Sequence, residues 1–276
     1  MALSLIAAIT YGAADFCGGL ATRRASMFAV AVLSQAVGFA LLLAVLPFTP
    51  GRTVPSDYVF GALAGVGGAL GVALLYHALS IGKMGIVSPI TAVLAASIPL
   101  IYGTVRGDRL ALTQMIGLVV ALIAIVMISL SFEDSGKREI ATEGVREAIL
   151  AGFGFGAFLI LLSNTHPAAG LHNLVAARLA SIALLLVVTF ATRTRLAAPR
   201  ADWPLIAVCG VFDMTANVLY VLATFYGSLA IAAVLTGLYP ASTVFLARVV
   251  LGERLGRTQK AGVAIALAGV VLISLR

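Results

Sequence analysis

Residues 252–275 read GERLGRTQKAGVAIALAGVVLISL, and residues 107–130 read GDRLALTQMIGLVVALIAIVMISL. Aligned without a gap at a constant separation of 145 residues, the two segments are identical at 12 of 24 positions. Self-similarity at a fixed separation is typical of an internal duplication. The chain is therefore predicted to consist of two related halves.

The composition is that of a membrane protein. Hydrophobic residues make up 61% of the chain and charged residues 11%, with a mean hydropathy of +1.10. Soluble domains contain about 25% charged residues. The apolar runs are nearly continuous and lack alternation of period 2, which favours membrane-spanning helices over a β-barrel. We expect an all-α integral membrane protein, located in the inner (plasma) membrane of a bacterium.

Ten apolar segments are long enough to be spans of ~20 residues. They lie at about residues 2–21, 27–48, 58–80, 84–104, 111–131, 146–164, 172–192, 203–224, 228–250 and 258–275. The polar segment 132–145 separates a first five-helix repeat, residues 1–131, from a second, residues 146–276. Because five is odd, the second repeat is predicted to enter the membrane with the opposite orientation. Inverted repeats are typical of transporters that work by alternating access around a site at mid-membrane.

Two short motifs add to this organisation. Leu238-Tyr-Pro240 is followed by Leu251-Gly-Glu-Arg-Leu255, and the first span contains Tyr11-Gly-Ala-Ala-Asp15-Phe16. With ten spans in two halves, the chain resembles the EamA-type branch of the drug/metabolite transporter superfamily. The resemblance implies a transporter of amino acids, other metabolites, sugars or drugs. The first half departs from the motif, with Gly-Asp-Arg at 107–109 and no proline aligned to Pro240.

Two carboxylates lie well inside predicted spans, Asp15 and Asp213. A charge at mid-membrane costs about 3 kcal/mol or more, so such residues are candidates for function. Asp213, Asn217 and Tyr220 are spaced i, i+4 and i+7, which places them on one helix face. Tyr11 and Asp15 repeat this spacing in the first span. We expect the two polar stripes to line one pathway for cargo and coupling ion.

Other candidates have alternative interpretations. Arg178 is a potential structural partner for an intramembrane aspartate, or a bidentate ligand for a substrate carboxylate. His77 is a potential proton relay or an interfacial structural residue. Tyr239 and Pro240 mark a broken span that should meet the cavity. Further polar positions at mid-membrane are Thr10, Gln35, Ser88, Thr91, Thr236 and Ser242.

Several classes of function lack their signatures. The sequence contains no Walker A, HExxH or GxSxG motif. His166 and His172 have no third ligand nearby, so we expect no metal and no cofactor. The net charge of +7 is dispersed over short loops and does not suggest nucleic acid. We therefore expect no enzyme, and predict instead a secondary active transporter bound to the lipid bilayer.

We expect an exporter of a small metabolite, amino acid or drug-like compound, coupled to protons through Asp15 or Asp213. The alternative is an uncoupled facilitator or an uptake carrier of the same fold. Two alternatives belong to other functional classes: an intramembrane enzyme, and a structural membrane protein without transport. The charged turns containing Asp108 and Glu253 are interpreted as solvated hairpins or, alternatively, as conformational latches. The oligomeric state is left open.

Basic residues are unequally distributed between the two sides of the predicted topology. One set of loops and span ends contains Arg23, Arg24, Lys83, Lys137, Arg138, Arg146, Arg193, Arg195, Arg200, Arg248, Arg254, Arg257 and Lys260. The other contains Arg52, Arg106, Arg109 and Arg276. The positive-inside rule predicts that both termini are extracytoplasmic. The family resemblance implies cytoplasmic termini instead.

Overall fold

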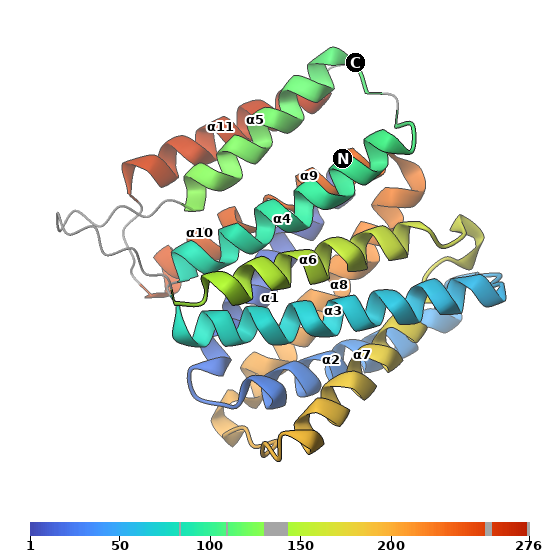
Figure 1. Ribbon diagram of the computed structural model, residues 1–276, viewed down its shortest axis with the longest axis vertical. Helices are drawn as coiled ribbons and strands as arrows, with labels where there is room; N and C mark the ends of the chain where they lie inside the picture. Colours follow the sequence, from blue (N-terminus) through green and yellow to red (C-terminus); the bar gives the residue numbers. More distant parts are fainter. Residues whose placement is uncertain (83, 109, 130–142, 252–255, 275–276) are drawn as a thin grey trace.

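The structure, a computed structural model, describes residues 1–82, 84–108, 110–129, 143–251 and 256–274 (Figure 1). All regular secondary structure in these ranges is helical. The α-helices are α1 (Ala2–Thr22), α2 (Met27–Val45), α3 (Pro55–Ile81), α4 (Met84–Val105), α5 (Leu112–Ser129), α6 (Val145–Ser163), α7 (His172–Ala191), α8 (Trp203–Tyr226), α9 (Leu229–Thr236), α10 (Tyr239–Leu251) and α11 (Arg257–Ser274). Three short 3-10 helices are η1 (Leu46–Phe48), η2 (Pro167–Ala169) and η3 (Arg200–Asp202).

Seven helical segments of the described chain are long and apolar enough to cross a membrane. They are Ala2–Thr22, Met27–Phe48, Pro55–Ile81, Val145–Ser163, His172–Ala191, Arg200–Tyr226 and Leu229–Val250. Shorter apolar helices occupy Ile90–Val105, Leu112–Met127 and Lys260–Ile273. Large apolar side chains such as Phe190 and Leu267 are exposed on the outside, where lipid rather than water would surround them. The predicted class, an all-helical integral membrane protein, is confirmed.

The segment 229–251 is broken, as the sequence predicts. Helix α9 ends at Thr236, and Gly237 and Leu238 form a turn before α10 begins at Tyr239. Pro240 is the second residue of α10, where its missing N–H removes no helical hydrogen bond. The break between α9 and α10 therefore places Pro240 in a first helical turn, where a backbone N–H would have no helical acceptor.

Two other prolines do not break their helix. Pro89 and Pro99 both lie within α4, which is continuous from Met84 to Val105. Transmembrane helices tolerate proline where neighbouring helices and side chains satisfy the freed backbone groups. Helix α4 therefore continues through both prolines.

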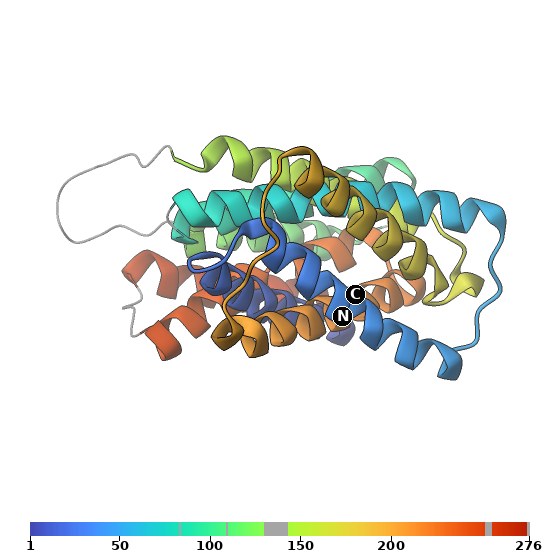
Figure 2. The same cartoon turned by 90° about the horizontal axis from the view of Figure 1, so that it is seen from below.

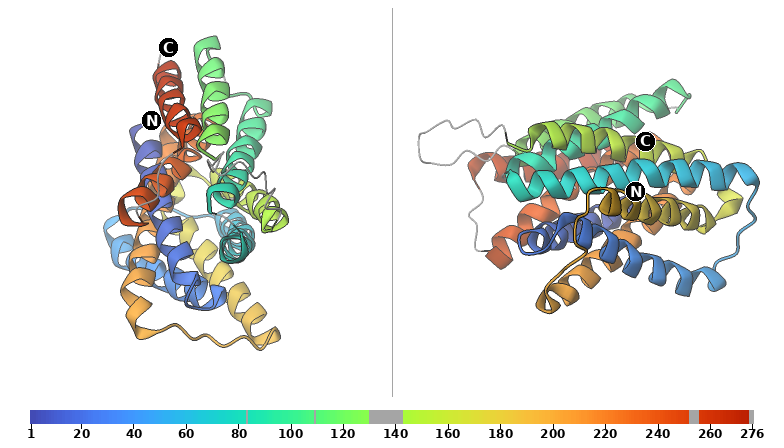
Figure 3. Two further views of the ribbon diagram at one scale, coloured as in Figure 1. Left: turned by 90° about the vertical axis from the view of Figure 1, so that its left-hand side faces the viewer. Right: turned by 60° about the horizontal axis from the view of Figure 1, so that its bottom comes forward.

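The helices lie side by side in one elongated bundle (Figures 1 and 2). In Figure 1, α5 and α11 lie together along one edge, and α2 and α7 lie at the opposite edge. Between these edges α1 packs on α8, α3 packs on α6, and α4 packs on α9. Helix α1 begins and α11 ends at the same end of the bundle, here called the terminal end (Figure 3). The other end is called the distal end.

Two glycines allow close contact between helices from different halves of the chain. A Cβ added at Gly65 of α3 would overlap the carbonyl oxygen of Ala177 on α7. A Cβ added at Gly210 of α8 would overlap the carbonyl oxygen of Ser34 on α2. Small residues permit such backbone contact in membranes. Gly65 and Gly210 are 145 residues apart, which is the separation found in the duplicated segments.

Candidate functional site

A cavity lies between the two halves of the chain. Among the described residues, its lining comes from every α-helix except α5 and α11. The empty space between the lining atoms amounts to about 910 Å³, open solvent included. Apolar side chains such as Phe155 and Phe158 form much of the wall. The polar lining residues are Tyr11, Asp15, Gln35, Tyr76, Arg178, Ser181, Asp213, Asn217, Thr236 and Tyr239.

An ion pair joins α7 and α8 within this cavity. Arg178 Nη2 donates a hydrogen bond to Asp213 Oδ2. The Arg178 side chain is 9% exposed and the Asp213 side chain 23% exposed. The contact agrees with the structural interpretation of Arg178, which assigned it to an aspartate. An anionic cargo would have to compete with Asp213 for the guanidinium group.

The two predicted polar stripes meet at Asn217. Tyr11 Oη on α1 donates to Asn217 Oδ1 on α8 at 2.9 Å, and Asn217 Nδ2 donates to the Asp213 carbonyl oxygen at 2.7 Å. These contacts join a residue from the first half to residues from the second. Tyr11, Asp15, Asp213 and Asn217 all line the same cavity. Helical spacing and the intramembrane position of the two aspartates therefore identified four residues that the fold brings together.

Asp15 differs from Asp213 because its carboxyl group has no hydrogen bond or ion pair with the described residues. The side chain lines the cavity and is half-buried. A carboxylate in such a place interacts with water, a proton or a ligand. Of the two intramembrane aspartates, Asp15 is therefore the one without a partner among the described residues.

Three predicted site residues lie outside the cavity lining. Tyr220 is fully buried between α8 and α6, where its hydroxyl donates to the Leu159 carbonyl oxygen at 3.3 Å. It follows Asn217 by three residues toward the terminal end of α8, beyond the cavity. His77 is half-buried on α3, and Pro240 is buried at the start of α10.

The residues that precede His77 and Pro240 in the sequence face the cavity instead. Tyr239 lines it, and its hydroxyl donates to the Ser88 carbonyl oxygen at 3.3 Å. Tyr76 lines it beside the buried Cys209, with 3.2 Å between Tyr76 Oη and Cys209 Sγ. A tyrosine next to His77 carried no sequence signal beyond its polarity, so Tyr76 was missed.

Three further lining residues have buried polar side-chain atoms without a hydrogen-bond partner among the described residues. They are Gln35, Ser181 and Thr236, from α2, α7 and α9. An unsatisfied buried group costs about 1 to 3 kcal/mol, so a ligand or water that satisfies it is favoured. Gln35 and Thr236 stood out in the sequence as polar residues within apolar spans, whereas Ser181 did not.

The charged turn between α4 and α5 has a structural role. Asp108 Oδ2 accepts hydrogen bonds from Ser228 Oγ at 2.7 Å and from the Ala230 N–H at 3.1 Å. It therefore caps the N-terminus of α9, a position that favours a carboxylate. Asp108 is partly exposed, and its carboxylate also binds Ser228 and Ala230 of the second half. The corresponding turn, residues 252–255, lies outside the described residues.

The described residues contain no group of three or more His, Cys, Asp or Glu side chains placed to hold a metal ion. Their arrangement is that of a helical membrane protein with a polar cavity between two halves. The model of the EamA-like transporter family matches residues 1–130 and, separately, residues 144–275. The chain therefore belongs to the EamA-like transporter family, a family of membrane transporters.

A likeness to a solved structure agrees with this assignment. A crystal structure of a protein superposes with a TM-score of 0.75 at 17% sequence identity, over 98% of each chain. At this level of identity the likeness shows the fold alone. No curated protein matches the sequence.

Proposed function

We propose that the protein is a secondary active transporter that exports a small metabolite, amino acid or drug-like compound by alternating access. The observation that carries the proposal is the cavity at the middle of the bundle, with Asp15, Asp213 and Arg178 inside it. Ionisable side chains at that depth are costly and mark transport pathways. A cargo would bind there and be released when the bundle changes its open side.

The packing of the helices supports an inverted repeat. Helix α1 of the first half packs on α8 of the second, and α6 of the second packs on α3 of the first. The described residues contain ten apolar helical segments when α9 and α10 are counted as one broken segment. We assign them to ten spans in two sets of five, residues 1–131 and 146–276, separated by residues 132–145. Exchange of conformation between two such sets produces alternating access.

The charges in the cavity favour neutral or positively charged cargo. The Arg178 charge is compensated by Asp213, whereas the Asp15 carboxyl has no basic partner within the described ranges. The aromatic walls at Phe155 and Phe158 favour a cargo with an apolar part. We assign proton coupling to Asp15, because Asp213 is already occupied by Arg178.

The distribution of basic residues favours a cytoplasmic location for the distal end. Arg23, Arg24 and Arg193 lie at this end, whereas Arg52 and Arg106 lie at the terminal end. By the positive-inside rule both termini are then extracytoplasmic. We further propose that the protein resides in the bacterial inner membrane and moves its cargo toward the terminal end.

Transport is tested with purified protein in proteoliposomes. A thermal-shift screen against amino acids, sugars, nucleosides and cationic drugs selects the compounds for flux assays. We expect flux of at least one compound, faster with an imposed pH gradient, and loss of that acceleration in Asp15→Asn. Thr10→Ala is the matched control on α1, because Thr10 bonds only to carbonyl oxygens of its own helix.

Three outcomes would contradict the proposal in different ways. If no ligand of the screen is moved, the transport function is rejected. If flux is independent of the pH gradient and unchanged in both Asp15→Asn and Asp213→Asn, the protein is an uncoupled facilitator. Preferred movement toward the distal end would identify an uptake carrier.

A further inference from the structure

Asp57 and Asp202 occupy equivalent positions in the two halves. They are 145 residues apart in the sequence, the separation of the duplicated segments. Asp57 lies in the first turn of α3, and Asp202 immediately precedes α8. The backbone N–H of each donates to the carbonyl oxygen three residues earlier, Val54 or Pro199, at 2.9 Å in both cases. Both residues are buried, with 0% and 3% of their surface exposed.

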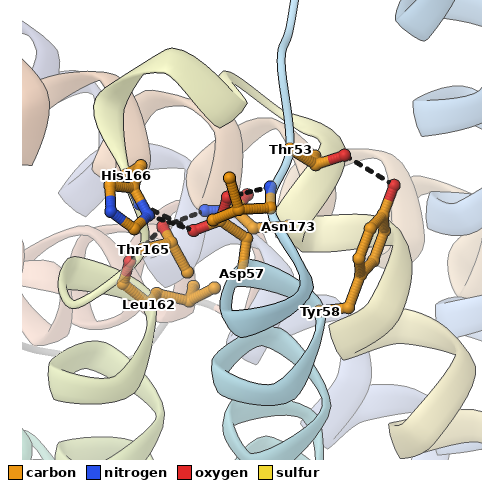
Figure 4. A network of polar contacts seen from close by, with 8 residues as sticks. Thr53, Asp57, Tyr58, Leu162, Thr165, His166 and Asn173 are labelled. Atoms are coloured by element: carbon orange, nitrogen blue, oxygen red, sulfur yellow. Dashed lines mark hydrogen bonds and ion pairs between the residues drawn. The ribbon is translucent and has the colours of Figure 1, made fainter.

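At the terminal end, Asp57 is bound by a loop of the opposite half. Its Oδ1 accepts the His166 N–H at 2.9 Å and lies 2.9 Å from His166 Nδ1 (Figure 4). His166 belongs to the connection between α6 and α7. A second contact joins the same two loops, because the Arg52 N–H donates to the Ala168 carbonyl oxygen at 2.7 Å.

The loop that carries His166 is itself braced. Asn173 Nδ2 donates to Thr165 Oγ1, and Thr165 Oγ1 donates to the Leu162 carbonyl oxygen at 2.8 Å (Figure 4). These bonds connect the end of α6 to the start of α7. His166 is therefore presented to Asp57 by a fixed backbone.

At the distal end the relationship is repeated with the halves exchanged. Asp202 Oδ1 pairs with Arg24 Nη1 at 3.5 Å. Arg24 belongs to the connection between α1 and α2, which corresponds to the connection between α6 and α7. Each buried aspartate therefore pairs with a basic side chain in the loop after the first helix of the other half.

We propose that these two contacts are paired latches that hold the terminal and distal ends closed in alternation during transport. The terminal latch is Asp57, Val54 and His166, and the distal latch is Asp202 and Arg24. Each latch joins the two halves at one end of the bundle, outside the residues that line the cavity. The inference rests on the proposed alternating access and adds the residues that control each side.

The two latches differ in the hydrogen bonds that each buried aspartate accepts. Asp57 Oδ2 accepts the Val54 N–H at 2.9 Å. The equivalent residue for Asp202 is Pro199, which has no N–H, and Asp202 Oδ2 is buried without a partner in the described part of the chain. Arg24 is also 68% exposed, and exposed ion pairs contribute little. The terminal end is therefore held more firmly than the distal end.

The test measures access to the cavity from each side of the membrane. A reporter cysteine replaces Ser181 in a background of Cys17→Ala and Cys209→Ser, the latter keeping a hydroxyl beside Tyr76. Right-side-out and inverted membrane vesicles are treated with a membrane-impermeant methanethiosulfonate. The measured quantity is the ratio of the labelling rates from the two ends, which requires no knowledge of the cargo.

Asp57→Asn is expected to raise labelling from the terminal end about tenfold, because a carboxylate loses charge-assisted hydrogen bonds. His166→Ala is expected to act in the same direction with a smaller effect, since the backbone N–H remains. Asp202→Asn is expected to raise labelling from the distal end about threefold, as its ion pair is weak. Thr53→Ala is the matched control, because Thr53 bonds to Tyr58 of its own half (Figure 4).

The outcomes separate the latches from the transport proposal. The latches would be overturned if the labelling ratio is unchanged in Asp57→Asn and His166→Ala. They would also be overturned if Asp57→Asn and Asp202→Asn shift the ratio toward the same side. In both cases persisting flux would leave the transport proposal intact. Absence of labelling from both sides in every variant would overturn alternating access at this cavity and the latches with it. Because His166 has an exposed side chain, its variant is expected to fold even if Asp57→Asn does not.

Discussion

Arg178 on α7 and Asp213 on α8 form an ion pair whose two side chains line the same cavity. Neutralising one partner leaves the other charge uncompensated. We expect Asp213→Asn or Arg178→Gln to destabilise the protein by about 2 kcal/mol. This is less than for fully buried pairs, because Asp213 retains 23% exposure. The double variant is expected to lose less than the sum of the two, measured by thermal unfolding in detergent. Additive losses would contradict an energetic pairing.

The glycine contacts predict matched losses in the two halves. Gly65→Ala and Gly210→Ala each place a methyl group against a backbone carbonyl of a neighbouring helix. A backbone atom cannot move aside as a side chain can, so each variant is expected to cost about 1 to 3 kcal/mol. Thermal unfolding checks both. Gly227→Ala is the control, because its backbone is extended and the nearest atom to an added Cβ is 3.3 Å away.

The difference in strength between the two latches is expected to depend on the residue three positions before each aspartate. Pro199→Val supplies the missing N–H to Asp202 and is expected to lower labelling from the distal end about threefold. Val54→Pro removes the N–H from Asp57 and is expected to raise labelling from the terminal end by a similar factor. The Ser181→Cys reporter measures both. Changes of equal sign at both ends would show that proline acts through general instability.

The charge distribution predicts the orientation in the membrane. An alkaline phosphatase fused after the C-terminus is expected to be active in cells, since that enzyme requires an extracytoplasmic location. A fluorescent protein fused at the same place is expected to remain dark. Fluorescence of that fusion would instead place the termini in the cytoplasm, as the family resemblance implies.

Much of the architecture could be predicted because long apolar segments and a repeated segment are local signals. Span positions, the broken segment before Tyr239 and the shared cavity of Tyr11, Asp15, Asp213 and Asn217 follow from periodicity and cost of charge. Tyr220 has the correct spacing but lies beyond the cavity. Helical spacing predicts a shared face and does not predict where along that face the cavity ends.

Contacts between loops were not predictable from the sequence. Asp57 and His166 are far apart in the chain, and each is an ordinary residue at a helix end. Nothing local distinguishes a buried aspartate that binds a loop of the opposite half from a solvated one. The same holds for Asp108, whose partner Ser228 is brought close only by the packing of α9 beside α4.

Duplication of an ancestral five-helix gene would produce a protein with two interchangeable ends and no preferred resting state. The substitution that distinguishes Pro199 from Val54 removes one hydrogen-bond donor from the turn that precedes the buried aspartate. Under the proposed latches, inherited symmetry supplies the machinery for both sides, and the pyrrolidine ring of Pro199 in an exposed connection would decide which side of the empty carrier opens first. A change at such a loop residue would then alter directionality and leave the residues that line the cavity as they are.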